Sequence, residues 1–366
     1  MLRFQMFFTF LCLLLYFTII ESLTISCYNN GSEVALVNFS KLPNFQEHPV
    51  CDSIVFSGQL DDTILQTFKT HFATNEQLKN LTVISTNLED LKDKVFQGLH
   101  TATLIKLNTI ERIKRSAFTG LDQLVYLDLQ SNKIKKLESG TFQHLPVLEE
   151  IHLIYNKISV IENSAFKNLP RLRNLDLAFN QIIKWNASYL EDVHNLVILD
   201  LGHNNIDKIQ EKSFQTLHHL ETLILVDNQI EFIEQNAFIG LDNLKQLRLG
   251  LNQISNLDVR FLSTLPNLNI LDLMYNKIKR IKSETFVNSS SITDIKLEHN
   301  KIEDIETKAF VNLPNLTYLG LIDNNISRFN NETMINVPNI KNISLEANPI
   351  IWSGMPFFIG PLNFHN

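Results

Sequence analysis

The stretch LVYLDLQSNKI, residues 124–134, decides the fold of this chain. Its asparagine, Asn132, has counterparts at intervals of 24 residues along the sequence. An earlier copy carries Thr86 at the asparagine position and brings the number of copies to twelve. Self-similarity at a fixed period of this length predicts stacked structural repeats. The other asparagines of the series are Asn108, Asn156, Asn180, Asn204, Asn228, Asn252, Asn276, Asn300, Asn324 and Asn348.

Each feature of the repeated stretch has a structural reason. Leu127 and Leu129 are two residues apart, so both side chains point to one face of a short strand. One strand cannot bury that face alone, which predicts that the copies stack into a parallel sheet over a continuous core. The asparagine side chain is expected to bond backbone groups where the chain leaves the strand, because those groups would otherwise be buried without partners.

A recurring phenylalanine is expected to fill the core on the other side of each repeat. Leu190, Leu262 and Met334 replace it at every third repeat. The sequence leaves open whether this records duplication of a three-repeat block or tunes curvature. The phenylalanines of the series are Phe96, Phe118, Phe142, Phe166, Phe214, Phe238, Phe286 and Phe310.

Residues 78–350 resemble the typical extracellular leucine-rich repeat, L-x-x-L-x-L-x-x-N-x-I-x-x-I-x-x-x-x-F-x-x-L. The resemblance implies an α/β solenoid, a leucine-rich repeat horseshoe with a concave parallel β-sheet of about twelve strands. Its convex side would be irregular or short-helical. The copy that contains Asn108 is two residues short, and counting back from Asn108 places His100 and Thr103 where leucine is usual.

Residues 1–22 are expected to be a signal peptide, because Arg3 precedes an apolar run over residues 6–20. The alternative is a retained N-terminal membrane anchor, since the run approaches bilayer-spanning length. No later stretch reaches that length, so no stable membrane span is expected after signal removal. Residues 23–77 are expected to form an N-terminal cap. Cys27 and Cys51 form an even pair in a secreted chain, which predicts a disulfide.

The two ends of the repeat region differ. Residues 54–56 are expected to pair with the first repeat of the 78–350 region. The last part, residues 351–366, is expected to be a short apolar C-terminal cap or tail. Asn348-Pro349 with Trp352 resembles the opening of the family's usual C-terminal cap, but no cysteine follows. The alternative is an exposed apolar patch that contacts a partner or a second copy.

Nine N-x-S/T triplets behind a signal peptide predict a secreted, extracellular glycoprotein. If the late triplets carry glycans, the free binding face lies toward the middle repeats. The candidate glycosylation sites are Asn30, Asn38, Asn80, Asn186, Asn288, Asn315, Asn325, Asn331 and Asn342.

Exposed aromatic and aliphatic side chains beside small residues are expected on the concave face, and a protein contact needs such a surface. The alternative is that positions next to the strands merely tolerate aromatic side chains. The candidate ligand-binding residues are Tyr126, His152, Ile154, Tyr155, Phe179, His203, Val226, Arg248, Met274 and Tyr275.

Asp128, Asp176, Asp200 and Asp272 form a further column on the same face. Calcium requires clustered oxygens, so the column is interpreted as part of the common L-D-L pattern. Arg248 interrupts it and could recognise a carboxylate or phosphate. No G-x-S-x-G, H-E-x-x-H or phosphate-loop motif occurs, which predicts no catalytic residues, no metal and no cofactor. The net charge of −7 argues against a nucleic-acid partner.

The pattern therefore favours a non-enzymatic binding protein that recognises an extracellular protein or a cell-surface or pathogen ligand on its concave face. Toll-like, Slit-like and chaoptin-like ectodomains share the repeat. Insect leucine-rich immune proteins share the secreted plan, but the C-terminal coiled coil typical of them is missing from this sequence. That resemblance implies innate immune recognition or cell adhesion, as a monomer, homodimer or heterodimer. The alternative is a structural matrix protein that self-assembles through its C-terminal tail.

Overall fold

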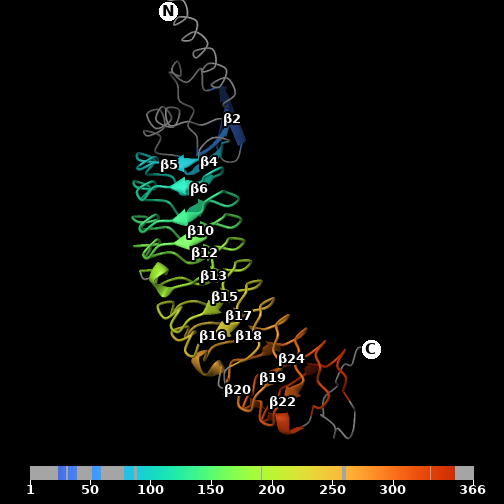
Figure 1. Ribbon diagram of the computed structural model, residues 1–366. Helices are drawn as coiled ribbons and strands as arrows, with labels where there is room; N and C mark the ends of the chain where they lie inside the picture. Colours follow the sequence, from blue (N-terminus) through green and yellow to red (C-terminus); the bar gives the residue numbers. More distant parts are fainter. Residues whose placement is uncertain are drawn as a thin grey trace, which may run out of the picture. The chain divides into compact units, whose positions relative to one another are not determined.

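The computed structural model of the 366-residue chain describes residues 24–29, 32–38, 52–58, 78–85, 89–190, 192–257, 261–329 and 331–350. The chain divides into two compact units, which join in sequence between Leu172 and Arg173. Within each unit the repeats stack as parallel strands (Figure 1). The expected signal peptide, the side chain of Cys27, Cys51 and the tail over residues 351–366 lie outside the described residues.

The first unit opens with an antiparallel element that leads into the parallel repeats. Strand β1 (Thr24–Asn29) pairs antiparallel with both β2 (Ser32–Asn38) and β3 (Ser53–Gly58). Strand β3 then pairs in parallel with β4, opposing Ile54 to Leu81. The prediction that residues 54–56 pair with the first repeat is therefore confirmed. The repeat strands of this unit are β4 (Asn80–Ser85), β6 (Leu104–Leu107), β8 (Tyr126–Asp128) and β10 (Glu150–His152).

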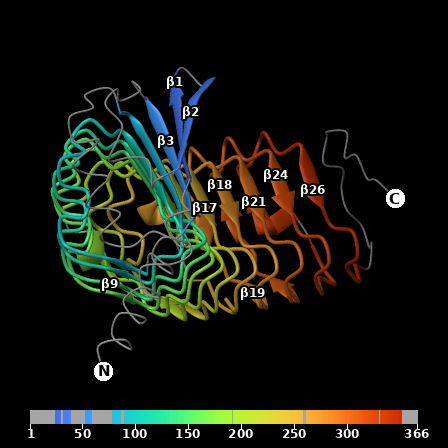
Figure 2. The ribbon, with the colours of Figure 1, turned by 90° about the horizontal axis from the view of Figure 1, so that it is seen from above.

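The second unit contains eight parallel repeat strands, five of which Figure 2 shows side by side as β17, β18, β21, β24 and β26. Each pair is offset by 24 residues, as in Leu199 opposite Leu223. With the four of the first unit they make twelve repeat strands, the number that the sequence predicts. The eight are β12 (Asn174–Asp176), β13 (Ile198–Asp200), β15 (Thr222–Ile224), β17 (Gln246–Arg248), β18 (Ile270–Asp272), β21 (Asp294–Lys296), β24 (Tyr318–Gly320) and β26 (Asn342–Ser344).

The connections between repeat strands contain only short elements. No α-helix occurs among the described residues, so the α part of the expected α/β class is limited there to three 3-10 helices. Each short connection must bring several side chains back to the core, which leaves no room for a helix long enough to be stable. The short strands are β5 (Asp90–Leu91), β7 (Arg112–Ile113), β9 (Lys136–Leu137), β11 (Val160–Ile161), β14 (Lys208–Ile209), β16 (Phe232–Ile233), β19 (Arg280–Ile281), β20 (Phe286–Val287), β22 (Asp304–Ile305), β23 (Phe310–Val311) and β25 (Met334–Ile335).

A 3-10 helix occurs in each described repeat that lacks the phenylalanine. The three helices are η2 (Ala187–Leu190), η3 (Phe261–Thr264) and η4 (Asn331–Thr333). Leu190 and Leu262 lie inside η2 and η3, and Met334 follows η4 directly. The substitution therefore accompanies a local change from turn to 3-10 helix.

The phenylalanine column, which comprises the eight phenylalanines of the series, forms the core opposite the sheet. Phe118, Phe142 and Phe166 are fully buried or nearly so. The rings of Phe142 and Phe166 stack with centroids 5.2 Å apart. In the second unit the buried Trp185 joins the column by stacking on Phe214, with ring centroids 6.2 Å apart.

The structure corrects the register of the copy that contains Asn108. Ile105 opposes both Leu81 and Leu127, and Ala102, not His100, is buried at the preceding core position. The two missing residues therefore fall between Leu107 and Asn108, not before the strand. The ladder of strand pairing fixes the register of each repeat strand, so the turn absorbs the deletion.

Candidate functional site

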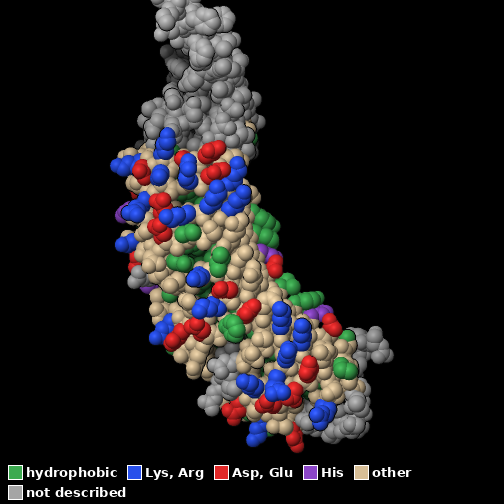
Figure 3. Space-filling view, in the orientation of Figure 1, with side chains coloured by type: hydrophobic (Ala, Val, Ile, Leu, Met, Phe, Trp, Pro, Cys, Tyr) green, Lys and Arg blue, Asp and Glu red, His purple; other side chains and the backbone are tan. Residues whose placement is uncertain are grey.

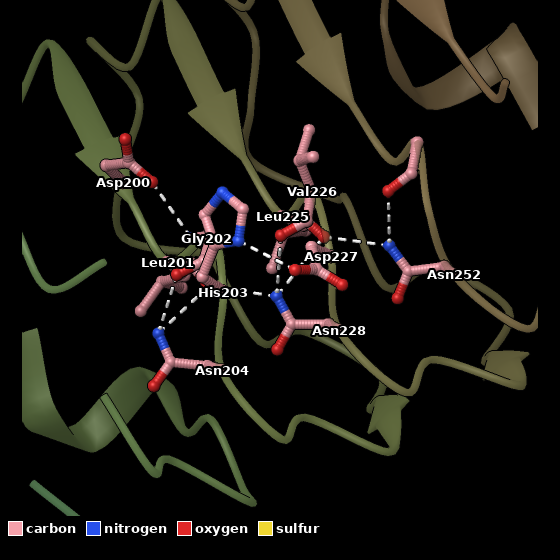
Figure 4. Close-up of polar contacts among 11 residues, drawn as sticks. Asp200, Leu201, Gly202, His203, Asn204, Leu225, Val226, Asp227, Asn228 and Asn252 are labelled. Atoms are coloured by element: carbon pink, nitrogen blue, oxygen red, sulfur yellow. Dashed lines mark hydrogen bonds and ion pairs between the residues drawn. The ribbon is translucent and has the colours of Figure 1, made fainter. Parts of the chain in front are cut away.

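The sheet face is the exposed side of the repeat strands. From the copy at Asn132 to the copy at Asn348 it is formed by the residues six, four, two and one positions before the repeat asparagine. Along its edge, buried asparagine side chains form hydrogen bonds with backbone groups. Asn228 Nδ2 donates to the carbonyl oxygens of Leu201 at 2.9 Å and Leu225 at 3.2 Å (Figure 4). Its Oδ1 accepts from the backbone N–H of Ile206 at 2.9 Å. Asn204 and Asn252 make the corresponding bonds, which confirms the predicted role of the asparagine column.

From the copy at Asn132 onward, the residue directly before each asparagine adopts a left-handed backbone conformation. These φ angles lie between 53° and 57° from Ser131 to Ala347. The left-handed region is uncommon for residues other than glycine, so the surrounding ladder must hold it in place. We call this series the αL column; it comprises Ser131, Tyr155, Phe179, His203, Asp227, Leu251, Tyr275, His299, Asp323 and Ala347.

The αL column projects large side chains into solvent. Tyr155 is 53% exposed, Tyr275 48%, Leu251 46% and Phe179 36%. Figure 3 shows hydrophobic, histidine and acidic side chains along one margin of the view. Four of the ten predicted ligand-binding residues, Tyr155, Phe179, His203 and Tyr275, belong to the column.

In the second unit three successive residues of the αL column form an ordered row. The Phe179 and His203 rings stack with centroids 3.9 Å apart and planes inclined by 12°. His203 Nδ1 lies 2.7 Å from Asp227 Oδ2 (Figure 4). Both contacts join residues 24 positions apart, so the register of the strands sets them.

The same row occurs again four repeats later. Tyr275 and His299 stack at 4.1 Å and 11°, and His299 Nδ1 lies 2.8 Å from Asp323 Oδ2. The predicted ligand-binding residues include Phe179, His203 and Tyr275. The other members of the two rows, Asp227, His299 and Asp323, were missed. The signal that could have found them is the column one position before each asparagine, where aromatic, histidine and aspartate follow one another twice.

The remaining candidates lie in two groups. In the first unit, Tyr126 contacts His152 with ring centroids 4.8 Å apart, and His152 Nε2 lies 3.1 Å from Glu150 Oε2. Ile154 is half-buried beside Tyr155. In the second unit, Val226 and Met274 are half-buried, and Arg248 is exposed with its guanidinium bonded to Gln246.

The aspartate column has a local structural role. Asp200 Oδ1 accepts from the backbone N–H of Gly202 at 2.8 Å, and Asp272 bonds Met274 in the same way. Burial raises the pKa of Asp200, the Gly202 hydrogen bond lowers it, and the neighbouring Asp176 raises it further. Within the described ranges no three His, Cys, Asp or Glu side chains are grouped so that they could hold a metal ion.

Glu298 is the one acid of the sheet face that is buried with an oxygen left unpaired in the described part of the chain. It is 5% exposed, and its Oε1 accepts from the Tyr318 hydroxyl at 2.7 Å, whereas Oε2 has no hydrogen-bond partner. The carboxylate lies directly over Gly320, where a Cβ would collide with it. Burial, together with the bond to Glu298, raises the pKa of Tyr318, and Ser344 opposes that shift.

A second surface lies on the opposite side of the second unit. It is a groove of about 820 Å³ next to Val287, Val311 and Ile335. Its rim carries a ladder of amides in which Asn336 Nδ2 donates to Asn312 Oδ1 and Asn312 Nδ2 donates to Asn288 Oδ1, at 2.9 and 2.8 Å. The ladder does not use Asn288 Nδ2, the atom to which a glycan would be attached.

Comparison with protein-family models matches the leucine-rich repeat over residues 76–134, 124–182, 194–254, 242–302 and 290–350. The chain belongs to the leucine-rich repeat family. A comparison with curated protein sequences gives no match. None of the helices among the described residues has the length and apolar character that crossing a bilayer requires.

Solved structures agree on the fold of this leucine-rich repeat chain. Toll in the Toll–Spatzle complex of Drosophila is 22% identical with a TM-score of 0.68, over 76% of this chain and 42% of that one. A chain of the LRIM1/APL1C complex is 21% identical with a TM-score of 0.65, over 81% and 52%. The TLR13–ssRNA13 complex gives 22% and 0.55, over 80% and 56%. The chain spans about half the length of these structures, and at these identities the likeness shows the fold.

Proposed function

We propose that this chain is a secreted, glycosylated leucine-rich repeat protein that binds an extracellular protein through its sheet face. The observation that carries the proposal is the αL column. The strand ladder and the buried asparagines fix its backbone, so its exposed aromatic side chains are ordered before a partner arrives. Preorganised aromatic side chains lose little entropy on binding, which favours affinity.

Two further observations support the extracellular setting. Two of the similar structures are complexes, one of Toll with Spatzle and the other of LRIM1 with APL1C. Asn186 and Asn288, two of the candidate glycosylation sites, are exposed. We propose innate immune recognition or cell adhesion as the setting, with the chain acting without catalysis or cofactor, alone or as a dimer. The signal peptide, the Cys27–Cys51 disulfide and the tail as a C-terminal cap are part of the same proposal.

Affinity capture from the protein's own extracellular fluid tests the proposal. Tyr155→Ala with Tyr275→Ala should abolish capture of the partner without changing secretion. Alanine is compatible with the left-handed backbone, because Ala347 occupies the same position with a φ of 55°.

Phe232→Ala is the matched control, since Phe232 is 63% exposed but lies on β16, away from the sheet face. Equal capture by the parent, the double variant and the control would contradict the assignment of the sheet face. Recovery of only the chain itself from all three would favour self-assembly through residues 351–366.

A further inference from the structure

The sheet face of the second unit carries an excess of acidic residues. Between residues 174 and 347, the four sheet-face positions of each repeat carry eight carboxylates in total but only two basic side chains, Arg248 and Lys296. An acidic face attracts a basic partner and accelerates the encounter with it. The eight carboxylates are Asp176, Asp200, Asp227, Asp272, Asp294, Glu298, Asp323 and Glu346.

Two groups show that part of this excess of acid is not compensated by the described residues. The pKa of Asp200 is raised first by burial and also by the charge of Asp176, and the Gly202 hydrogen bond and the charges of His203 and Arg248 offset this only in part. A cation placed on this face would relieve that repulsion. Glu298 supplies independent evidence, because its buried Oε2 lacks the hydrogen-bond donor that a buried carboxylate oxygen ordinarily has.

The two aromatic–histidine–aspartate rows supply the geometry. Asp227 and Asp323 each give one oxygen to a histidine and are more than half exposed, so each carboxylate has further acceptor capacity. Phe179 and Tyr275, with their stacked histidines, provide an apolar and aromatic surface beside each carboxylate. Such a surface suits the stem and the cation of an arginine or lysine side chain.

The rows are related by translation and not by a two-fold axis, because the strands that carry them are parallel. They are four strands apart, because Asp227 follows β15 and Asp323 follows β24, with β17, β18 and β21 between these two strands. At about 4.8 Å per strand the separation is about 19 Å, which an extended polypeptide covers in about six residues. Side chains an even number of residues apart lie on the same side of an extended segment.

We propose that the sheet face of the second unit binds a basic, extended polypeptide segment whose arginine or lysine side chains, about six residues apart, pair with Asp227 and Asp323. The inference rests on the proposed function and names the chemistry of its partner. Glu298, beside the second row, accepts a further donor from the same segment.

Fluorescence anisotropy of the full chain with synthetic peptides tests this inference. The probe is a labelled twelve-residue peptide of Gly, Ser and Thr with two arginines six residues apart. One comparison peptide has the arginines three residues apart, on opposite sides, and another has glutamates in their place. We expect the first peptide to bind at least tenfold more tightly than either comparison peptide, and raised salt to weaken it.

The variant Asp227→Asn with Asp323→Asn should weaken that binding at least tenfold. Asparagine tolerates the left-handed backbone, so folding should be preserved. The matched control is Asp242→Asn with Asp207→Asn, which removes two charges elsewhere. Asp242 lies 3.1 Å from His218 in a histidine–aspartate pair that is not on the sheet face.

Equal weakening in both double variants, or no preference for arginines six residues apart, would overturn the proposal. Its failure is distinguishable from failure of the proposed function. If Tyr155→Ala with Tyr275→Ala abolishes capture of the natural partner while Asp227→Asn with Asp323→Asn retains it, the sheet face binds a partner that is not basic.

Discussion

The phenylalanine column and the αL column repeat with the same 24-residue period but differ in how much their side chains vary. Where each ring packs on the ring of the next repeat, as Phe118 does on Phe142, the same residue recurs. Where the side chain meets solvent, the series runs through serine, tyrosine, phenylalanine, histidine, aspartate and leucine. The packing of neighbours fixes the first column, whereas only the backbone conformation of the second is fixed. The side chains of the αL column can therefore vary without loss of packing, as the residues of a binding surface must.

The largest expected effect comes from the phenylalanine column. Phe142→Ala should lower the free energy of unfolding by about 4 kcal/mol, because it opens a cavity between two stacked neighbours. Tyr275→Ala in the αL column should cost about 1 kcal/mol or less, since it loses one exposed stack. Urea denaturation of both variants measures the difference. Equal losses would mean that the two columns contribute alike to stability.

The expected loss of stability in the asparagine column lies between those of the phenylalanine column and the αL column. Asn228→Ala should cost about 3 kcal/mol, because it leaves the carbonyls of Leu201 and Leu225 and the N–H of Ile206 without this partner. Asn205→Ala, at an exposed position nearby, should stay within about 0.5 kcal/mol of the parent. A small loss for Asn228→Ala would show that water replaces the asparagine in the turn.

Deleting residues 351–366 separates the two interpretations of the tail. In the sequence Phe358, Ile359 and Asn363 fall 24 residues after Met334, Ile335 and Asn339, which favours the capping role. We expect the deletion to cost about 2 kcal/mol, the value of burying one large apolar side chain. Denaturation and sedimentation measure it. Unchanged stability with loss of an oligomer would favour the self-assembly interpretation.

The sequence predicted the number of repeat strands, the register of all but one of them, the phenylalanine column and the asparagine bonds, because each depends on a residue that recurs at a fixed interval. The deletion in the copy at Asn108 was placed wrongly, since counting from the asparagine cannot tell whether the strand or the turn is shortened. The rows ending in Asp227 and Asp323 were missed for another reason. Their partners lie 24 residues away, and only the strand ladder brings them within bonding distance.

The smallest expected effect is a difference in how stability depends on pH between a carboxylate on the sheet face and one on a short strand of the connections. The pKa of Asp200 on the sheet face is raised by burial, whereas the pKa of Asp90 on β5 is lowered by its hydrogen bond with Arg112. A raised carboxyl pKa means that the contribution of Asp200 is most favourable below the ordinary value of 3.8 and is lost as the pH rises through the folded-state pKa. For Asp90 the contribution is present above 3.8 and is lost as the pH falls through its lowered pKa.

Asp200→Asn should therefore gain stability relative to the parent as the pH rises from 3 to 7, because its amide oxygen can still accept from Gly202 without a charge. Asp90→Asn should lose stability over the same range, because the ion pair with Arg112 is gone. Urea midpoints at intervals of half a pH unit measure both slopes, and Asp207→Asn controls for the removal of one exposed charge. Slopes of the same sign would show that net charge, and not the local environment of each carboxylate, governs the pH dependence.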